Sequence, residues 1–246
     1  GMLDELFGWQ SNFLVLAGLG LITVVICFFD LKETATSQST SFADQFRQYP
    51  ELLTSRRFWG YCLSAAFGSG AFFAYLGGAP YVGSELFHLS PAVLGYYFGA
   101  PAVGYFAGNF ITARFVSRFG INGLIVTGGA ILVAGMALSL AVFYAGFSSA
   151  TIFFGLMTFI GLGNGLVMPN ANAGLLGVRP HLAGSASGLG GAIMIGGGAA
   201  LSALAGAVLK PGTGAFPLLW IMFITAVMSL ASILYVLRRE KALGVS

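Results

Sequence analysis

GLGNGLVMPNANAGLLG, residues 161–177, combines the apolar composition of a membrane span with three asparagines and a proline. It lies within sixty consecutive residues, 119–178, that contain no charged side chain. A bilayer core of about 30 Å is crossed by a helix of about 20 apolar residues. The run is therefore long enough for two crossings. A plain anchor needs none of these amides, because an unpaired polar group costs free energy in lipid. The stretch predicts a membrane helix whose polar side chains have a further role.

The composition of the whole chain is that of a membrane protein. Hydrophobic residues make up 57% of its 246 residues and charged residues 8%, whereas about a quarter of a soluble protein is charged. Residues 144–149, YAGFSS, supply a polar break in the sixty-residue run. We expect an all-α integral membrane protein with seven transmembrane helices, near residues 10–29, 58–84, 91–113, 121–145, 150–176, 183–209 and 215–237.

The basic residues are distributed unequally between the two sets of connections. Ten of the eleven lysines and arginines lie in alternate connections and the C-terminal end, and Lys210 is the exception. Cytoplasmic loops carry the excess of positive charge in membrane proteins. The pattern predicts an N-terminus outside the cell and a C-terminus in the cytoplasm. The net charge of +3 comes from these loops and does not indicate a nucleic-acid surface.

Chemistry of other kinds finds no support in the sequence. Cys27 and Cys62 both fall within predicted spans, so neither indicates a disulfide or a metal site. Glu85 and His88 lie in an outer loop, where a loop role is favoured over proton relay. No nucleophile–base pair, ligand set or phosphate loop is recognisable. We therefore expect no enzyme, no cofactor and no metal.

The domain organisation is one helix, a linker and a bundle. Residues 1–29 form the first transmembrane helix, 30–57 a cytoplasmic linker, 58–241 a six-helix bundle and 242–246 a tail. Within the linker, Phe42, Phe46, Tyr49 and Leu53 share one face of a possible amphipathic surface helix. A solvated loop is an equally good interpretation of that segment.

Glycine and proline recur through the predicted helices. Small residues four apart occur in GYFAG (104–108), GLGNG (161–165) and GSASG (184–188), a spacing that lets helix backbones approach closely. Pro80, Pro101 and Pro169 fall within or near the ends of three spans and should kink them. Static packing explains any one motif, but the set favours a transporter that moves.

Uncharged polar and aromatic side chains fall on common helix faces. Asn164, Met168 and Asn172 follow at i, i+4 and i+8, and Asn170 lies about 200° from Met168, where packing is expected. Pro169 frees the carbonyl of Gly165, which can face a cavity or a water. Interhelical hydrogen bonding is the alternative for each amide. The proposed substrate-binding set is Phe72, Tyr75, Tyr105, Asn109, Asn164, Met168 and Asn172.

Two segments carry a family resemblance. GWQSNFLVLAGLGLITVVICFFDLKET (8–34) resembles the sixth helix of major facilitator superfamily drug exporters. FIGLGNGLVMPNANAGLLGVRPHLAGSASGLGGAIMIGGGAALSALAG (159–206) resembles helices ten and eleven of their Bcr/CflA branch. The similarity covers nearly all of residues 8–239 but only the second half of a twelve-helix family. It implies a facilitator fold, drug antiport across a bacterial inner membrane, and coupling acids in an N-terminal half that is not present here.

One motif of that family is altered in this chain. The cytoplasmic loop after the eighth family helix often has the pattern Gly-x-x-x-Asp-Arg-x-Gly, and residues 113–120 are ARFVSRFG. Arg118 and Gly120 match the motif, whereas Ala113 and Ser117 replace the glycine and the acid. Simple anchoring at the cytoplasmic surface is the favoured role of Arg114 and Arg118.

Taken with the resemblance, these patterns predict the C-terminal portion of a multidrug efflux transporter for small amphipathic organic compounds. Its partners would be the lipid bilayer and either an N-terminal half-transporter or a second copy of the chain. One alternative is a half-size protein that assembles without transporting anything. A seven-helix receptor is another, although Lys32, Lys210 and Lys241 lie at ends or in loops, where they could not hold retinal.

Overall fold

The computed structural model describes residues 7–30 and 49–244, and their regular structure is entirely helical. The chain divides into two compact units, residues 1–45 and 46–246. Phe42 and Phe46 of the expected amphipathic helix lie outside the described residues. Its continuation over residues 49–53 is helical, with Leu52 fully buried and Leu53 exposed.

The first unit contains helix α2 (Gln10–Asp30). Its 21 residues span about 31 Å at 1.5 Å per residue, which matches the hydrocarbon core of a bilayer. From Phe13 onward every residue of the helix is exposed, and the exposed side chains are almost all apolar. A helix that is apolar on all sides is suited to lipid or to another membrane helix.

The second unit is a helical bundle, and three of its helices begin at a serine that caps the first turn. The serine hydroxyls of Ser55, Ser90 and Ser149 accept hydrogen bonds from backbone N–H groups at the starts of α4, α5 and α7. The elements are α4 (Arg56–Tyr81), the π-helical turn η1 (Val82–Leu86), α5 (Pro91–Tyr97), α6 (Ala100–Tyr144), α7 (Ala150–Leu156), α8 (Thr158–Gly177), the 3₁₀ turn η2 (Pro180–Leu182), α9 (Ala183–Val208) and α10 (Phe216–Leu243).

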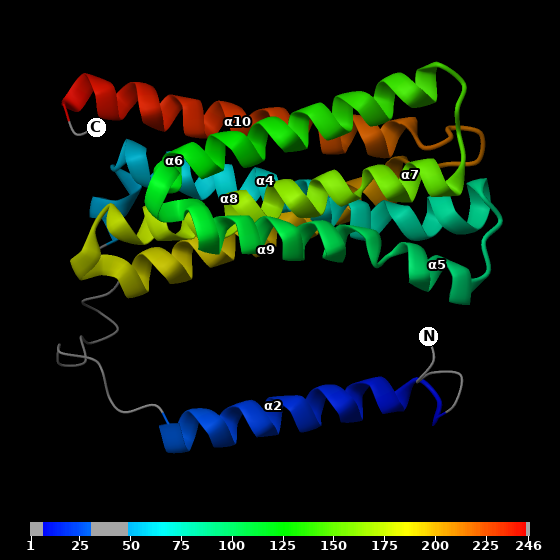
Figure 1. The fold of residues 1–246 in the computed structure, drawn as a ribbon, viewed down its shortest axis with the longest axis horizontal. Helices are drawn as coiled ribbons and strands as arrows, with labels where there is room; N and C mark the ends of the chain where they lie inside the picture. Colours follow the sequence, from blue (N-terminus) through cyan, green and yellow to red (C-terminus); the bar gives the residue numbers. More distant parts are fainter. Residues whose placement is uncertain (1–6, 31–48, 245–246) are drawn as a thin grey trace. The chain divides into compact units, whose positions relative to one another are not determined.

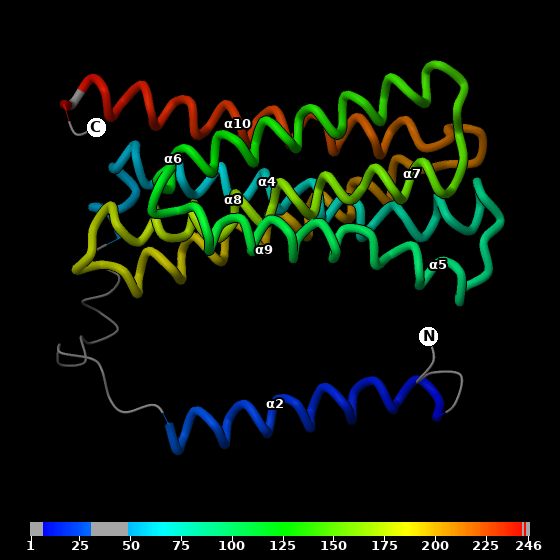
Figure 2. The backbone as a smooth tube through the Cα atoms, in the orientation of Figure 1, coloured from blue at the N-terminus to red at the C-terminus, as the bar shows by residue number. Residues whose placement is uncertain are grey.

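Helix α6 contains a reversal of the chain. Gly120 has φ +69° and ψ 165°, a backbone conformation that side-chain-bearing residues rarely adopt, and the chain turns back there (Figures 1 and 2). Six helical stretches among the described residues are long and apolar enough to cross a membrane, and the stretch 91–144 makes two passes. Divided at Gly120, these stretches give seven helical segments, the number that the apolar runs of the sequence predict.

The bundle segregates its charges between two ends. Figure 1 shows the start of α4, the Gly120 reversal, the α8–α9 connection and the end of α10 at one end of the unit. These segments carry Arg56, Arg57, Arg118, Arg179 and Arg238–Lys241. The α9–α10 connection, which contains Lys210, lies at the opposite end with η1. The basic residues that alternate along the sequence thus gather at one end, which we call the basic end.

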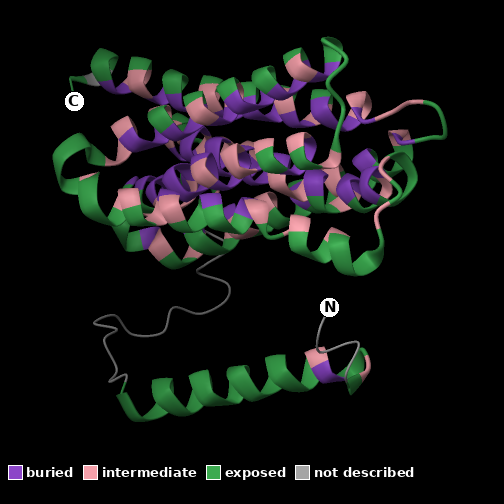
Figure 3. Cartoon of the chain, turned by 45° about the vertical axis from the view of Figure 1, so that its right-hand side comes forward, coloured by how far each residue is buried: buried purple, intermediate pink, exposed green. Residues whose placement is uncertain are grey.

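Helices α6 and α8 touch through their backbones. A Cβ atom added at Gly161 would overlap the carbonyl oxygen of Pro101, and one at Gly104 would overlap that of Thr158. At Gly165 an added Cβ would lie 2.6 Å from the carbonyl oxygen of Tyr105. Glycine is required here because no larger side chain fits between the two helices. Buried residues fill the interior of the bundle (Figure 3).

A buried carboxylate joins three helices at the basic end. Glu240 on α10 is 5% exposed, and its oxygens accept hydrogen bonds from Arg57 and Tyr61 on α4 and from Asn122 on α6. The Arg57 Nη2–Glu240 Oε1 distance is 2.6 Å. The Tyr61 hydroxyl shares its single proton between Asn122 Oδ1, at 2.7 Å, and Glu240 Oε1, at 3.2 Å. A buried charge is tolerated when its partners satisfy it in this way.

The glycine contact gives a direct prediction. Gly161→Ala should destabilise the bundle by about 1–3 kcal/mol, since its methyl group must push α6 and α8 apart. Gly196→Ala on α9 is the matched control, because Gly196 is exposed and an added Cβ meets no atom within 4 Å. Thermal unfolding midpoints of the purified proteins in detergent measure the difference. Equal midpoints for the two variants would contradict the close approach.

Candidate functional site

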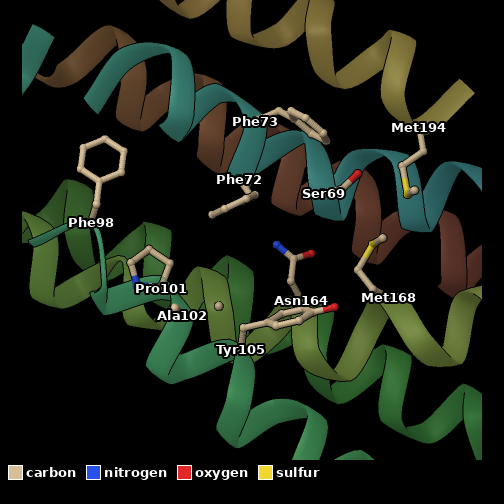
Figure 4. A pocket seen from close by; sticks show the side chains of 11 residues that line it. Ser69, Phe72, Phe73, Phe98, Pro101, Ala102, Tyr105, Asn164, Met168 and Met194 are labelled. Atoms are coloured by element: carbon tan, nitrogen blue, oxygen red, sulfur yellow. The ribbon is translucent and has the colours of Figure 1, made fainter. Parts of the chain in front are cut away.

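A cavity of about 470 Å³ lies inside the bundle, in the size range of about 300–1,000 Å³ that is usual for small-molecule sites. Its walls come from α4, the junction of α5 with α6, α8 and α9 (Figure 4). We call it the central cavity. Its lining residues are Ser69, Phe72, Phe73, Phe98, Pro101, Ala102, Tyr105, Gly161, Asn164, Met168 and Met194.

Helical periodicity places these side chains together. Ser69, Phe72 and Phe73 follow at i, i+3 and i+4 on α4, and Gly161, Asn164 and Met168 follow at i, i+3 and i+7 on α8. The helix is interrupted between α5 and α6 by a turn at Phe98 and Gly99, and the Phe98 ring lies at one end of the cavity. Each helix thus contributes one face to the same space.

The central cavity contains no charged side chain, and its walls are mostly aromatic, aliphatic or thioether surface. Asn164 is its most buried polar group, at 4% exposure. Its Oδ1 is one of three buried side-chain polar atoms in the described residues that lack a hydrogen-bond partner. Figure 4 shows this amide among Ser69, Phe72, Tyr105 and Met168. An unpartnered amide inside an apolar cavity is available to a ligand or a water.

An aromatic layer supports the cavity wall from behind. The Tyr75 ring is fully buried and lies 6.3 Å from Phe72 and 5.1 Å from Phe98, measured between ring centroids. Its hydroxyl is another of the three unpartnered atoms. Tyr75 does not line the central cavity itself. It holds in place the two phenylalanines that do.

Four of the seven proposed substrate-binding residues line the central cavity, namely Phe72, Tyr105, Asn164 and Met168. Asn109 lies one turn after Tyr105 and donates its amide to the Tyr105 carbonyl at 2.8 Å. Asn172 lies one turn after Met168 and is exposed. Sequence reasoning omitted Ser69, although it is three residues from Phe72 on the same face. It also omitted Met194, because α9 has too few large side chains to mark a face.

The carbonyl freed by Pro169 is used in packing. The Thr112 hydroxyl on α6 donates to the Gly165 carbonyl at 2.9 Å, so this oxygen bonds to another helix, whereas a cavity or a water was expected. Asn170 is 2% exposed, and its amide donates to the Leu166 carbonyl at 2.7 Å and to the Thr112 hydroxyl at 3.3 Å. Asn170 is therefore part of helix packing, on the side away from Met168.

The altered loop motif lies at the α6 reversal. Gly120 occupies the turn, and its positive φ explains why glycine stands there. Arg114 and Arg118 are exposed, and the Arg118 guanidinium lies 5.5 Å from the centroid of the Phe119 ring. Neither arginine forms an ion pair within the described residues. Both side chains are therefore exposed at the basic end of the bundle, and their anchoring role stays a prediction.

Comparisons with known proteins agree on one family. The model of the Major Facilitator Superfamily matches residues 1–203. An uncharacterized MFS-type transporter, YdgK, of Bacillus subtilis is 29% identical over 89% of this chain and 54% of its own length. A bicyclomycin resistance protein homolog of Haemophilus influenzae is 28% identical over 98% of this chain and 60% of its own length. The chain thus spans little more than half the length of the curated relatives it matches.

The cross-helix hydroxyl yields a second prediction. Thr112→Val should lower stability by about 1–3 kcal/mol, because the Gly165 carbonyl would be left buried without a donor. Thr127→Val is the control, since the Thr127 hydroxyl is exposed and bonds only the Gly123 carbonyl of its own helix. Urea or thermal unfolding of both proteins in the same detergent provides the comparison. If the two substitutions prove equally mild, the Thr112 bond contributes nothing to the packing of α6 on α8.

Proposed function

Because the chain belongs to the major facilitator superfamily and is a multi-pass protein of the bacterial cell membrane, we propose that it is the C-terminal portion of a multidrug efflux transporter. The observation that carries the proposal is the central cavity, which is uncharged, largely apolar and supplied with one unpartnered amide. Membership of a transporter family also argues against an enzyme and against a seven-helix receptor.

The chemistry of the central cavity favours small amphipathic organic compounds. Phenylalanine rings and two methionines offer adaptable apolar contacts, and a flexible thioether tolerates ligands of different shape. Asn164 can both donate and accept hydrogen bonds, so it can orient a carbonyl, hydroxyl or amide of a neutral compound. One relative is named for bicyclomycin resistance, so bicyclomycin is a suitable first compound to test.

A second half of the transporter would complete the site. Asp, Glu, Lys, Arg and His are absent from mid-membrane depth in the described helices, where ion-coupling groups usually lie. We propose that an N-terminal half-transporter supplies them. A second copy of the chain could complete the site as a symmetric pair, but its identical helices would add no ion-coupling group. Exposed Gly196 and Gly197 on α9 support this arrangement, because small residues favour contact with another helix. Asn109 and Asn172 would then line the path from the cavity toward the basic end.

Assembly without transport is the remaining alternative, and the exposed glycines of α9 fit it equally well. The two functions differ in their effect on drug accumulation in cells. A transporter lowers drug accumulation in cells that express it with its partner half, whereas an assembly protein leaves accumulation unchanged. Uptake of a fluorescent, uncharged amphipathic compound by such cells distinguishes the two functions.

For orientation, we propose that the basic end of the bundle faces the cytoplasm, as the excess of arginine there predicts. Cysteine introduced at Gly212, beside Lys210, should react with a membrane-impermeant maleimide added to intact cells. Cysteine introduced at Ser117, beside Arg118, should react only after the cells are opened. Because Gly212 has φ +87°, Thr213→Cys serves as a second outer position. The reverse pattern of labelling would overturn the orientation.

Substitutions in the central cavity test the site. Asn164→Ala and Met168→Ala should change resistance to individual drugs by about 2- to 12-fold while membrane expression persists, as expected for the loss of one uncharged contact. Asn172→Ala tests the proposed path in the same assay and should change the resistance profile as well. Thr127→Ala on the outside of α6 is the control. If both cavity variants match the parent for every drug, the substrate binds elsewhere in the molecule.

A further inference from the structure

A second apolar depression lies on the outside of the bundle, between α4 and α10, and has a volume of about 260 Å³. Trp59, Gly60 and Leu63 form one wall, and Met228, Ala231, Ser232 and Tyr235 form the other. Met228 and Tyr235 are each 44% exposed, so the depression is open on the outer surface of α10. We call it the α4–α10 groove. It is separate from the central cavity in all of its lining residues.

The dimensions of the groove suit a hydrocarbon chain. Its α10 wall runs from Met228 to Tyr235, which is about 10 Å along a helix, and its volume then leaves a mean cross-section of about 25 Å². That is a channel for one extended chain. The volume is below the range of about 300–1,000 Å³ for drug-sized ligands. Gly60 contributes to the floor, because a Cβ there would overlap Val236 and hold the helices apart.

Two arginines continue the walls of the groove at the basic end. Arg56 precedes Trp59 by three residues, and Arg239 follows Tyr235 by four. At 100° per residue both lie within about 30° of the mean direction of the lining residues on their helices. Both also lie where the helices leave the apolar part of the bundle. The groove therefore has an apolar body and a cationic end.

The cationic end carries unsatisfied charge. Of the described carboxylates at the basic end, Glu240 is paired with Arg57, and Glu51 is paired with Arg179 and approached by His181. Neither Arg56 nor Arg239 has an ion-pair partner within the described residues. The Tyr235 hydroxyl likewise lacks a hydrogen-bond partner there. The Trp59 indole is fixed by a 2.8 Å hydrogen bond to the Leu53 carbonyl, which makes it a rigid wall at the interfacial depth that Trp and Tyr favour.

We propose that the α4–α10 groove is a binding site for an acidic phospholipid of the membrane leaflet at the basic end. One acyl chain lies between Trp59 and Tyr235, and the headgroup phosphate is bound by Arg56 and Arg239. Guanidinium groups match the geometry of phosphate oxygens, and basic pockets between membrane helices bind anionic headgroups. Charge complementarity selects an acidic lipid over a neutral one. The proposal does not depend on whether the chain transports drugs.

Native mass spectrometry of the purified protein in an uncharged detergent tests the proposal. Phosphatidylglycerol and phosphatidylcholine with identical acyl chains are titrated separately. Retention of phosphatidylglycerol should exceed that of phosphatidylcholine, and Arg56→Gln with Arg239→Gln should weaken phosphatidylglycerol binding by about 30-fold. Arg114→Gln with Arg118→Gln is the matched control, because it removes the same charge from the same end on α6. The control should bind phosphatidylglycerol like the parent.

A second variant tests the position of the acyl chain. It also keeps the proposal testable if the Arg56→Gln, Arg239→Gln double variant does not fold. Ala231→Trp adds bulk at an exposed position inside the groove and should abolish tight binding while leaving all charges in place. Unfolding midpoints without lipid confirm that each variant is folded. Equal binding of the two lipids, equal loss in the Arg114/Arg118 control, unchanged binding by Ala231→Trp, or no retained lipid would each overturn the proposal.

Discussion

The close approach of α6 and α8 is the constraint on which the rest of the bundle depends. Glycines at 104, 108, 161 and 165 bring the two backbones into contact, and added side-chain atoms there would meet carbonyl groups. Lipid cannot drive helices together as water does, so contact between backbones and polar bonds between helices must supply the attraction. Thr112 continues this contact on either side of Pro169, through its bond to the Gly165 carbonyl and the bond that it accepts from Asn170. The second pass of α6 also meets α8, at Gly128 and Gly163.

The position of the central cavity follows from that contact. Gly161 lies against Pro101 at the edge of the cavity, and Asn164 and Met168 line the cavity together with residues of α4 and α9. Asn170, on the other side of α8, is occupied by its bonds to Thr112 and Leu166. Two asparagines of one short segment therefore have different roles. Asn170 stabilises helix packing, and Asn164 remains without a hydrogen-bond partner in the cavity. Pro169 lies between these two asparagines in the sequence.

Much of this architecture could be predicted from charge spacing and helical periodicity. Most helix ends agree with the predicted spans to within a few residues, because charges and glycines mark them in the sequence. The exceptions are the first pass of α6, which continues to Gly120, and α10, which continues to Leu243. Periodicity also grouped Asn164 with Met168. It could not identify Met194 or the Thr112 bond, since both depend on which helices become neighbours. Nor could it distinguish Tyr75 from Phe72, because a buried ring and a cavity-lining ring have the same spacing along α4.

The Glu240 cluster has a consequence for the order in which the protein is built. Arg57 and Glu240 are separated by 183 positions, and they join the first helix of the bundle to its last. A protein is synthesised from its N-terminus, so its early helices form first. The three groups that bind the Glu240 carboxylate, Arg57, Tyr61 and Asn122, are therefore made before it. The hydrogen bonds that join α4 and α6 to α10 through Glu240 can therefore form only after the last turn of α10 has been synthesised.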